Sequence, residues 1–417
     1  RMTSHNLMLM LLSFGTLLLV ARSLGELAER LHQPAVLGEL LAGILLGPTV
    51  LGNLAPGVAE SLFPAQGPNA VALEAIATLA IVLFLLVAGI EVDLSTVWRQ
   101  GNIGLKVGIV GMVIPFALGL LAAWLAPQAL GREAGAEPLV FALFLATALS
   151  ITALPVIAKT LMDLGLYRSD MGMIVVSAAI FNDLVGWIAF AIIMGMMGTA
   201  AAHVDSIPAT IGYTLGFVAL MLTAGRWAIH RILPALQAYT RWPGGVLSFS
   251  LVLALFGAAF TEWIGIHAIF GAFLLGVVVP HDSALARAFT QQLRHVVTIL
   301  LLPAFFAFTG MRTRIDLLSA PALWLLCGLI IMTAIAGKFG GTFAAARLTG
   351  LRWREAALLG ALMNTRGLME LIVLNVGLEL GVISPTLFAM MVLMALVTTM
   401  LTSPLLRILK LQTIPEE

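Results

Sequence analysis

The sequence predicts an all-α polytopic membrane protein of about thirteen transmembrane helices that form inverted-topology repeats. Three observations predict this class: the composition, the number of long apolar runs, and short motifs that occur once in each half of the chain. Of the 417 residues, 60% are hydrophobic and 10% are charged, whereas soluble globular proteins have about 25% charged residues. So few charged side chains cannot cover a water-facing surface, which excludes a soluble enzyme, a disordered scaffold and a nucleic-acid binder.

The charge balance and the cysteine count exclude further classes. A formal net charge of +1 provides no basic surface for a polyanion, so we expect no nucleic-acid partner. The chain has one cysteine, Cys327, which excludes a disulfide framework and a cysteine-based metal site.

The elements follow from apolar runs, because a spanning helix needs about 20 mostly apolar residues. The runs at 266–280 and 296–310 are the shortest. The thirteen expected spans are 7–24, 35–52, 71–90, 104–126, 138–162, 172–197, 208–228, 245–263, 266–280, 296–310, 322–346, 355–378 and 385–406.

The orientation follows from lysine and arginine, which accumulate on the cytoplasmic side. With thirteen spans, one side of the membrane carries only four basic residues, Arg1, Arg132, Arg312 and Arg314. Two further basic residues, Lys338 and Arg366, lie inside spans. The remaining sixteen of the 22 basic residues lie on the other side. We therefore expect a multi-pass protein of the inner or plasma membrane, with its N-terminus outside and its C-terminus in the cytoplasm.

Three motif pairs relate the two halves and match the second span with the ninth, the third with the tenth and the fifth with the twelfth. The pairs are 38–43 with 271–276, 83–89 with 304–310, and 152–155 with 364–367. An offset of seven helices inverts the second copy in the membrane. Inverted repeats are typical of secondary transporters, whose substrate sites lie near the membrane centre between discontinuous helices.

Asp183, near the middle of the sixth span, is the first candidate site residue. A charged side chain at that depth is costly and therefore suggests function. Its carboxylate offers the same oxygens to a monovalent cation and to a proton, so the two would compete. Asn182 beside it offers an uncharged amide oxygen. The structural alternatives are that a nearby base neutralises Asp183 and that Asn182 binds backbone carbonyls.

The run SITALP at 150–155 interrupts the fifth span. Pro155 removes a backbone donor and clashes with the preceding turn, so carbonyls near Ile151 and Thr152 would be freed to face a cation. Ser150, Ile151 and Thr152 are the expected ion-binding residues of this run, and Thr152 joins Asp183 as an expected cation ligand. The alternative is an ordinary proline kink.

The run at 364–370, from Asn364 to Glu370, is the matching interruption in the twelfth span. Arg366 and Glu370 are four residues apart and can pair on one helical face. We interpret them first as a structural ion pair and second, together with Asn364, as a gate or a source of electric field.

Two further charged residues lie inside spans. Lys338 of the eleventh span would pair with a carboxylate or supply positive charge near the interrupted helices, with snorkelling to an interface as the alternative. Glu39 of the second span is equally compatible with lining a vestibule and with structural pairing.

Together these motifs resemble the monovalent cation:proton antiporter-2 family, which includes bacterial sodium/proton and Kef-type potassium transporters and plant cation/proton exchangers. The resemblance covers nearly the whole chain. The motifs that carry it are LGELLAGILLGP at 37–48, FLLVAGIE at 84–91, SITALPVIA at 150–158, FND at 181–183 and MNTRGLMELI at 363–372.

The resemblance implies one transmembrane exchanger domain over 1–417, in which two interrupted helices cross at the ion site. It implies core helices at about 71–198 and 296–406, which move against scaffold and dimer helices at about 7–52 and 208–280. Asp183 matches the ion- and proton-binding aspartate of the family, and Thr152 the hydroxyl near the unwound helix. Lys338 resembles the basic residue of the core. Asn182 stands where electrogenic relatives have a second aspartate, so Lys338 needs another partner or a different role.

The predicted function is exchange of Na+ or K+ for H+, one for one and therefore electroneutral, without an enzymatic reaction. We expect a homodimer in membrane lipid, with no cofactor beyond the transported Na+ or K+ and H+. The sequence leaves open whether a soluble regulatory domain or subunit outside this sequence acts on the protein. The alternatives are an uncoupled or gated potassium efflux pathway and a transporter-fold ion sensor. An organic-anion symporter is disfavoured, because an aspartate would repel the substrate.

Overall fold

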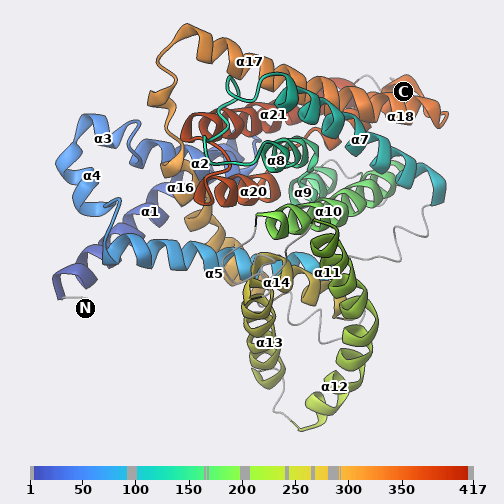
Figure 1. Cartoon of the computed structure of the whole chain (residues 1–417), viewed down its shortest axis with the longest axis horizontal. Helices are drawn as coiled ribbons and strands as arrows, with labels where there is room; N and C mark the ends of the chain where they lie inside the picture. The colour runs from blue at the N-terminus through green and yellow to red at the C-terminus, as the bar shows by residue number, and fades with distance from the viewer. Residues whose placement is uncertain are drawn as a thin grey trace. The chain divides into compact units, whose positions relative to one another are not determined.

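The computed structural model describes residues 4–91, 101–163, 166, 169–197, 207–239, 244–263, 268–279, 291 and 293–411 (Figure 1). Within these residues the secondary structure is helical, apart from one isolated β-bridge between Arg132 and Ile383. The all-α prediction is therefore confirmed. Arg1 and both ends of the expected span 266–280 lie outside the described residues.

Each expected span contains helix within its described residues, and helices also occur outside the expected spans, as at Pro56–Leu62. Their bounds are α1 (Ser4–Arg30), α2 (Ala35–Leu46), α3 (Leu51–Leu54), α4 (Pro56–Leu62), α5 (Pro68–Glu91), α7 (Gly101–Leu125), α8 (Pro138–Ser150), α9 (Leu154–Asp163), α10 (Asp170–Met196), α11 (Ile207–Leu220), α12 (Arg226–Tyr239), α13 (Gly244–Trp263), α14 (Ala268–Val278), α16 (Leu302–Arg312), α17 (Pro321–Ile335), α18 (Gly341–Leu348), α19 (Trp353–Met363), α20 (Leu368–Glu379) and α21 (Pro385–Leu411). Short turns join some of them: the π-helical turns η1 (Met221–Gly225), η2 (Val297–Leu301) and η4 (Ala336–Gly340), and the 3-10 turn η3 (Ile315–Leu317).

Proline and glycine set several helix ends. Pro138, Pro321 and Pro385 each begin a helix, where a residue without a backbone N–H is tolerated because that donor has no partner in the helix. Gly381 follows α20 with φ of 65°. The next N–H, that of Val382, donates to the carbonyl of Gly377 at 2.8 Å, which closes the helix in the geometry that favours glycine.

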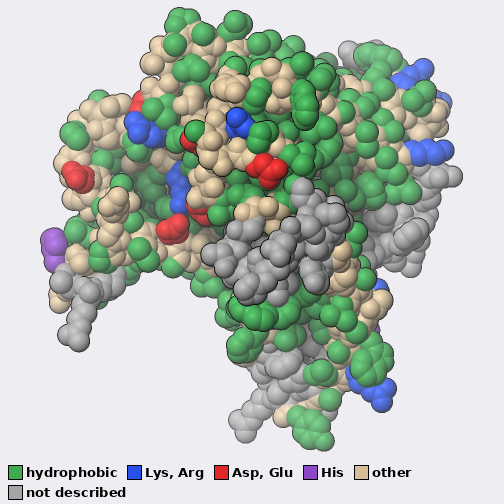
Figure 2. Space-filling view, viewed as in Figure 1, with side chains coloured by type: hydrophobic (Ala, Val, Ile, Leu, Met, Phe, Trp, Pro, Cys, Tyr) green, Lys and Arg blue, Asp and Glu red, His purple; other side chains and the backbone are tan. Residues whose placement is uncertain are grey.

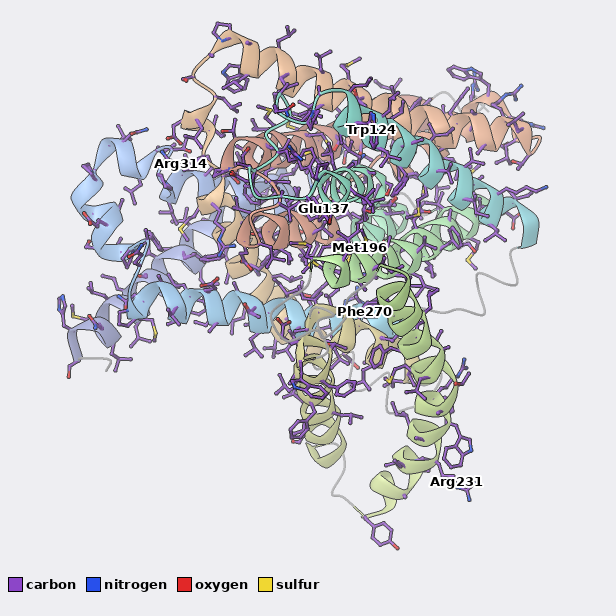
Figure 3. The ribbon with its side chains drawn as sticks, viewed as in Figure 1. Trp124, Glu137, Met196, Arg231, Phe270 and Arg314 are labelled. Carbon is purple, nitrogen blue, oxygen red and sulfur yellow. The ribbon has the colours of Figure 1, made fainter. Side chains whose placement is uncertain are left out.

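Nine helical segments of the described residues are long and apolar enough to cross a membrane, judged by length and composition. Shorter apolar helices accompany them, among them α8 and α14. The face in Figure 2 is largely hydrophobic, with few charged side chains. Trp124 of α7, labelled in Figure 3, is 75% exposed, which suits contact with lipid. A multi-pass membrane fold is therefore confirmed, while the count of thirteen spans stays a prediction.

The chain forms two compact units. The first contains Arg1–Val71, Leu94–Gly186 and Phe306–Glu417, and the second contains Ala72–Asp93 and Trp187–Phe305. Every candidate site residue lies in the first unit. The second includes α12, from which Arg231 projects (Figure 3), with its guanidinium carbon 6.0 Å from the Trp227 ring centroid. The expected division into core and scaffold helices stays a prediction.

Two of the motif pairs, 38–43 with 271–276 and 83–89 with 304–310, make the same helix contact once in each unit. In the first unit Gly43 of α2 packs on Gly310 of α16, and in the second Gly276 of α14 packs on Gly89 of α5. A Cβ atom at any of these four glycines would overlap the backbone of the facing helix. The repeated motifs are therefore close-packing sites, because only glycine lets two helices approach so closely.

The neighbouring helices repeat a second contact. Gly38 of α2 packs on the carbonyl of Leu24 in α1, and Gly271 of α14 packs on the carbonyl of Gly257 in α13. The positions correspond by a single offset, since 271 − 38 and 257 − 24 both equal 233. This agreement extends the predicted repeat to the first and eighth spans.

Candidate functional site

The first interruption separates α8, which ends at Ser150, from α9, which begins at Leu154. Residues 151–153 are not helical, and Ile151 has an extended backbone with ψ of 151°. Pro155 lies in the first turn of α9, where a missing N–H costs nothing. The predicted break is therefore confirmed, and the carbonyls at the end of α8 have no partner within that helix.

The second interruption separates α19, which ends at Met363, from α20, which begins at Leu368. The two breaks meet: the N–H of Ala153 donates to the carbonyl of Thr365 at 3.2 Å. A Cβ atom on Gly367 would lie 3.0 Å from the Cβ of Ala153. Two interrupted helices therefore cross at their non-helical segments, as the resemblance implied.

Two cations cap the carbonyl end of α8. Arg366 donates from Nη1 to the carbonyl of Ala148 at 3.0 Å and from Nη2 to that of Leu149 at 2.7 Å. The Lys338 ammonium donates to the carbonyl of Ser150. The end of a helix is the negative end of its dipole, so it favours positive charge. Three successive carbonyls that the helix leaves unpaired are thus bound by two buried basic side chains.

Asn182 of α10 is the side-chain partner of Lys338. With the amide oriented to satisfy both of its ends, Oδ1 lies 3.0 Å from the Lys338 ammonium and Nδ2 donates to the carbonyl of Gly108 at 2.8 Å. In this orientation the Thr152 hydroxyl also donates to Oδ1, at 3.3 Å. Lys338 lies in the π-helical turn η4 between α17 and α18, and such turns are frequent at functional sites.

Asp183 follows Asn182 in α10 and is 5% exposed. Its Oδ1 is buried and has no hydrogen-bond partner among the described residues. Lys338 acts on this carboxylate electrostatically. A buried carboxylate oxygen without a donor is costly, and a proton or a bound cation would remove that cost. The site thus combines one carboxylate with uncharged oxygens and one ammonium.

Comparison with known proteins decides the family. The family described as "Sodium/hydrogen exchanger, transmembrane" matches residues 15–409. The chain belongs to the sodium/hydrogen exchanger family.

Relatives of this exchanger agree on the class of transport. The Na(+)/H(+) antiporter NhaS4 of Synechocystis sp. is 36% identical over 404 residues, which cover 97% of this chain and 98% of that protein. Cation/H(+) antiporter 19 of Arabidopsis thaliana is 34% identical over 96% of this chain and 49% of its own length. K(+)/H(+) antiporter 1 of Saccharomyces cerevisiae is 33% identical over 97% of this chain and 46% of its own length. The exchanger therefore belongs among the cation/proton antiporters and spans about half the length of these plant and yeast relatives.

A solved antiporter structure has a similar fold. The structure of the sodium proton antiporter MjNhaP1 from Methanocaldococcus jannaschii at pH 8 matches with a TM-score of 0.69 over 98% of this chain and 100% of that chain. At 16% sequence identity, this likeness concerns the fold.

Arg366 and Glu370 lie on one face, as their spacing predicted. Arg366 Nη1 is 3.5 Å from Glu370 Oε2, and both side chains are almost completely buried. Both terminal nitrogens of Arg366 already donate to α8 carbonyls at shorter distances. The guanidinium therefore links Glu370 of α20 to the end of α8. The spacing of residues 366 and 370 predicts their pairing but not this contact with α8.

The other predicted residues take different positions. The Ser150 hydroxyl donates to the carbonyl of Thr147 at 2.9 Å, within its own helix. It is the Ser150 carbonyl, not the hydroxyl, that binds Lys338. Asn364 caps the end of α19, and its Oδ1 is buried without a partner among the described residues. Glu39 is not part of these contacts: in α2, its Oε1 lies 4.0 Å from Nη1 of Arg22.

Sequence reasoning missed two contributors to the site. Gly108 supplies the carbonyl that orients Asn182, and a Cβ there would lie 3.1 Å from the Phe181 ring. The GxxxG spacing of Gly104 and Gly108 is a signal for such close packing. Thr399 of α21 binds the backbone of the second break, and a buried threonine in an apolar helix has no comparable signal.

Proposed function

We propose that this exchanger moves Na+ or K+ in one direction and H+ in the other by alternating access, with both ions competing for Asp183. The observation that carries the proposal is the buried Asp183 oxygen without a hydrogen-bond partner among the described residues, next in sequence to Asn182, whose side chain contacts Thr152 of the first break and Lys338. A hard monovalent cation prefers oxygen ligands, and the carbonyls of 150–152 and the Thr152 hydroxyl lie at or beside the first break.

Lys338 has a defined part in this proposal. Its ammonium occupies the Ser150 carbonyl and the Asn182 amide oxygen, which are oxygens that a dehydrated cation would also use. A cation that arrives at Asp183 competes with this tethered ammonium, and a proton on Asp183 leaves the ammonium in place. Lys338 thus opposes simultaneous loading of the site by both ions, which is the condition for coupled exchange.

The charge balance supports a stoichiometry of one for one. Asp183 contributes one negative charge, and Asn182 beside it contributes none. The site therefore has the same net charge when it holds one monovalent cation as when it holds one proton. Each step in either direction then carries the same charge across the membrane, so exchange would be electroneutral.

The topology and assembly complete the proposal. The bias of lysine and arginine favours an external N-terminus and a cytoplasmic C-terminus. We keep the homodimer in the inner or plasma membrane as part of the proposal, because the resemblance implies a dimer scaffold.

The test is cation-induced collapse of an imposed pH gradient in proteoliposomes. Na+, K+ and Li+ are added in turn to the wild type, to Asp183→Asn and to Glu39→Gln. Glu39 is the matched control, because it is a buried carboxylate of a spanning helix outside the site. The proposal expects cation-specific collapse in the wild type and in Glu39→Gln, and none in Asp183→Asn. Collapse that persists in Asp183→Asn, or cation flux that leaves the pH gradient intact, would overturn it.

A further inference from the structure

Thr399 of α21 makes two hydrogen bonds to one residue of the second helix break. Its hydroxyl donates to the carbonyl of Arg366 at 2.6 Å and accepts from the N–H of Arg366 at 3.2 Å. Thr399 is buried, with 2% of its surface exposed. One side chain therefore satisfies both backbone groups of a residue that has left the helix.

These bonds matter because the break lies inside a membrane protein. Non-helical backbone at membrane depth is tolerated only where other groups satisfy its N–H and C=O. Without Thr399, the Arg366 backbone would lose the described partner of each group. A hydroxyl on a neighbouring helix therefore determines where the main chain of the break lies.

The position of that main chain is transmitted to the ion site. From this backbone the Arg366 guanidinium reaches the carbonyls of Ala148 and Leu149. The next carbonyl, that of Ser150, binds Lys338. A shift at Arg366 would therefore move the end of α8, from which the expected cation ligands begin.

A parallel contact joins the same two elements. The Thr365 hydroxyl donates to the Thr402 hydroxyl at 3.2 Å, and the Thr365 carbonyl accepts from Ala153 in the first break. Two threonines one turn apart on α21 thus hold consecutive residues of the second break, which is itself bonded to the first.

We propose that Thr399 is a positioning residue for cation binding, because its hydroxyl fixes the Arg366 backbone and, through Arg366, the carbonyl end of α8. This inference rests on the proposed exchange at Asp183. It adds a residue of α21 whose described hydrogen bonds go to the Arg366 backbone and not to Asp183.

Thr398 provides a matched control on the same helix. It is also fully buried, but its hydroxyl donates to the carbonyls of Met394 and Ala395 within α21. Replacement of either threonine by valine removes one hydroxyl and keeps the shape. Only at position 399 does the change release the second break.

The experiment measures the apparent KM for the cation and the maximal exchange rate in proteoliposomes for the wild type, Thr399→Val, Thr399→Ser and Thr398→Val. Loss of two hydrogen bonds leads us to expect an apparent KM about tenfold higher in Thr399→Val. Thr399→Ser and Thr398→Val should stay within about twofold of the wild type. Recovery by serine would show that the hydroxyl, and not the general packing, is responsible.

Equal KM values in Thr399→Val and Thr398→Val would overturn the inference, as would a serine variant as impaired as the valine variant. If Thr399→Val yields no folded protein, Thr399→Cys and Thr398→Cys replace the valine pair, since a thiol is a weak hydrogen-bonding group of similar volume. A wild type that does not exchange cations for protons refutes the proposed function. A wild type that exchanges, with both variants unaffected, refutes only the role of Thr399.

Discussion

Replacement of Arg366 by lysine tests whether geometry or charge holds the end of α8. Arg366 donates to two successive carbonyls, those of Ala148 and Leu149, from its two terminal nitrogens. The guanidinium presents these donors in a fixed fork, whereas a lysine ammonium is a single point charge on a flexible chain. Arg366→Lys therefore keeps the positive charge beside Glu370 but leaves one buried carbonyl unbound.

The magnitude follows from that one lost bond. A hydrogen bond to a charged group contributes about 1.5–3 kcal/mol, and each 1.4 kcal/mol or so corresponds to a factor of about ten. We therefore expect exchange efficiency, the maximal rate divided by the apparent KM, to fall by about 10- to 150-fold.

The assay is gradient collapse in proteoliposomes, with Arg347→Lys as the matched control. Arg347 donates from Nη1 to one carbonyl, that of Leu351, at 2.8 Å, which lysine can also serve. Arg347→Lys should exchange like the wild type. If Arg366→Lys also keeps wild-type efficiency, the fork is unnecessary and Arg366 acts through its charge alone.

Three further predictions follow. Gly43→Ala and Gly276→Ala should each destabilise the protein by about 1–3 kcal/mol, because the new Cβ meets facing backbone that cannot move aside. Thermal unfolding in detergent checks this, with Gly328→Ala as the control, because no atom of the described residues beyond its chain neighbours and its own helix backbone lies within 4 Å of a Cβ there. A control as unstable as the other two would contradict the packing argument. Asn182→Leu should lower exchange efficiency more than tenfold or so, because Lys338 loses a buried hydrogen-bond partner, and unchanged transport would show that this contact is dispensable. The wild-type exchange rate should not respond to an imposed membrane potential, because one site charge serves both ions, and a voltage-sensitive rate would disprove electroneutral exchange.

Much of the fold was predictable because its causes are local. Burial in lipid requires long apolar runs, so the sequence indicated the helical segments. Proline lacks a backbone N–H and clashes with the preceding turn, so Pro155 indicated the first break, although Pro115, Pro234 and Pro404 lie inside helices. The paired motifs indicated a repeat, but the close helix contacts of their glycines became visible only in the structure, where Gly43 lies against Gly310, and Gly276 against Gly89.

The candidate site was predictable in its residues but not in its connections. Asp183, Lys338 and Arg366 stood out because charge inside a membrane is costly. The hydrogen-bond partners of the two basic residues could not be identified from the sequence, because Arg366 and Lys338 bind main-chain carbonyls of α8. Every residue carries a carbonyl, so no sequence pattern marks the ones that a distant cation will cap.

The sequence by itself determined the helices, their two interruptions and the chemical groups available to bind an ion, since each depends on neighbours along the chain. Only the tertiary structure decided that Asn182 is the side-chain partner of Lys338, and that Thr399 holds the second break. The physical reason is that these bonds join separate helices, and which face meets which is set by packing of the whole bundle. An interrupted helix must obtain its missing hydrogen bonds from such neighbours, so the site exists only once the bundle is assembled.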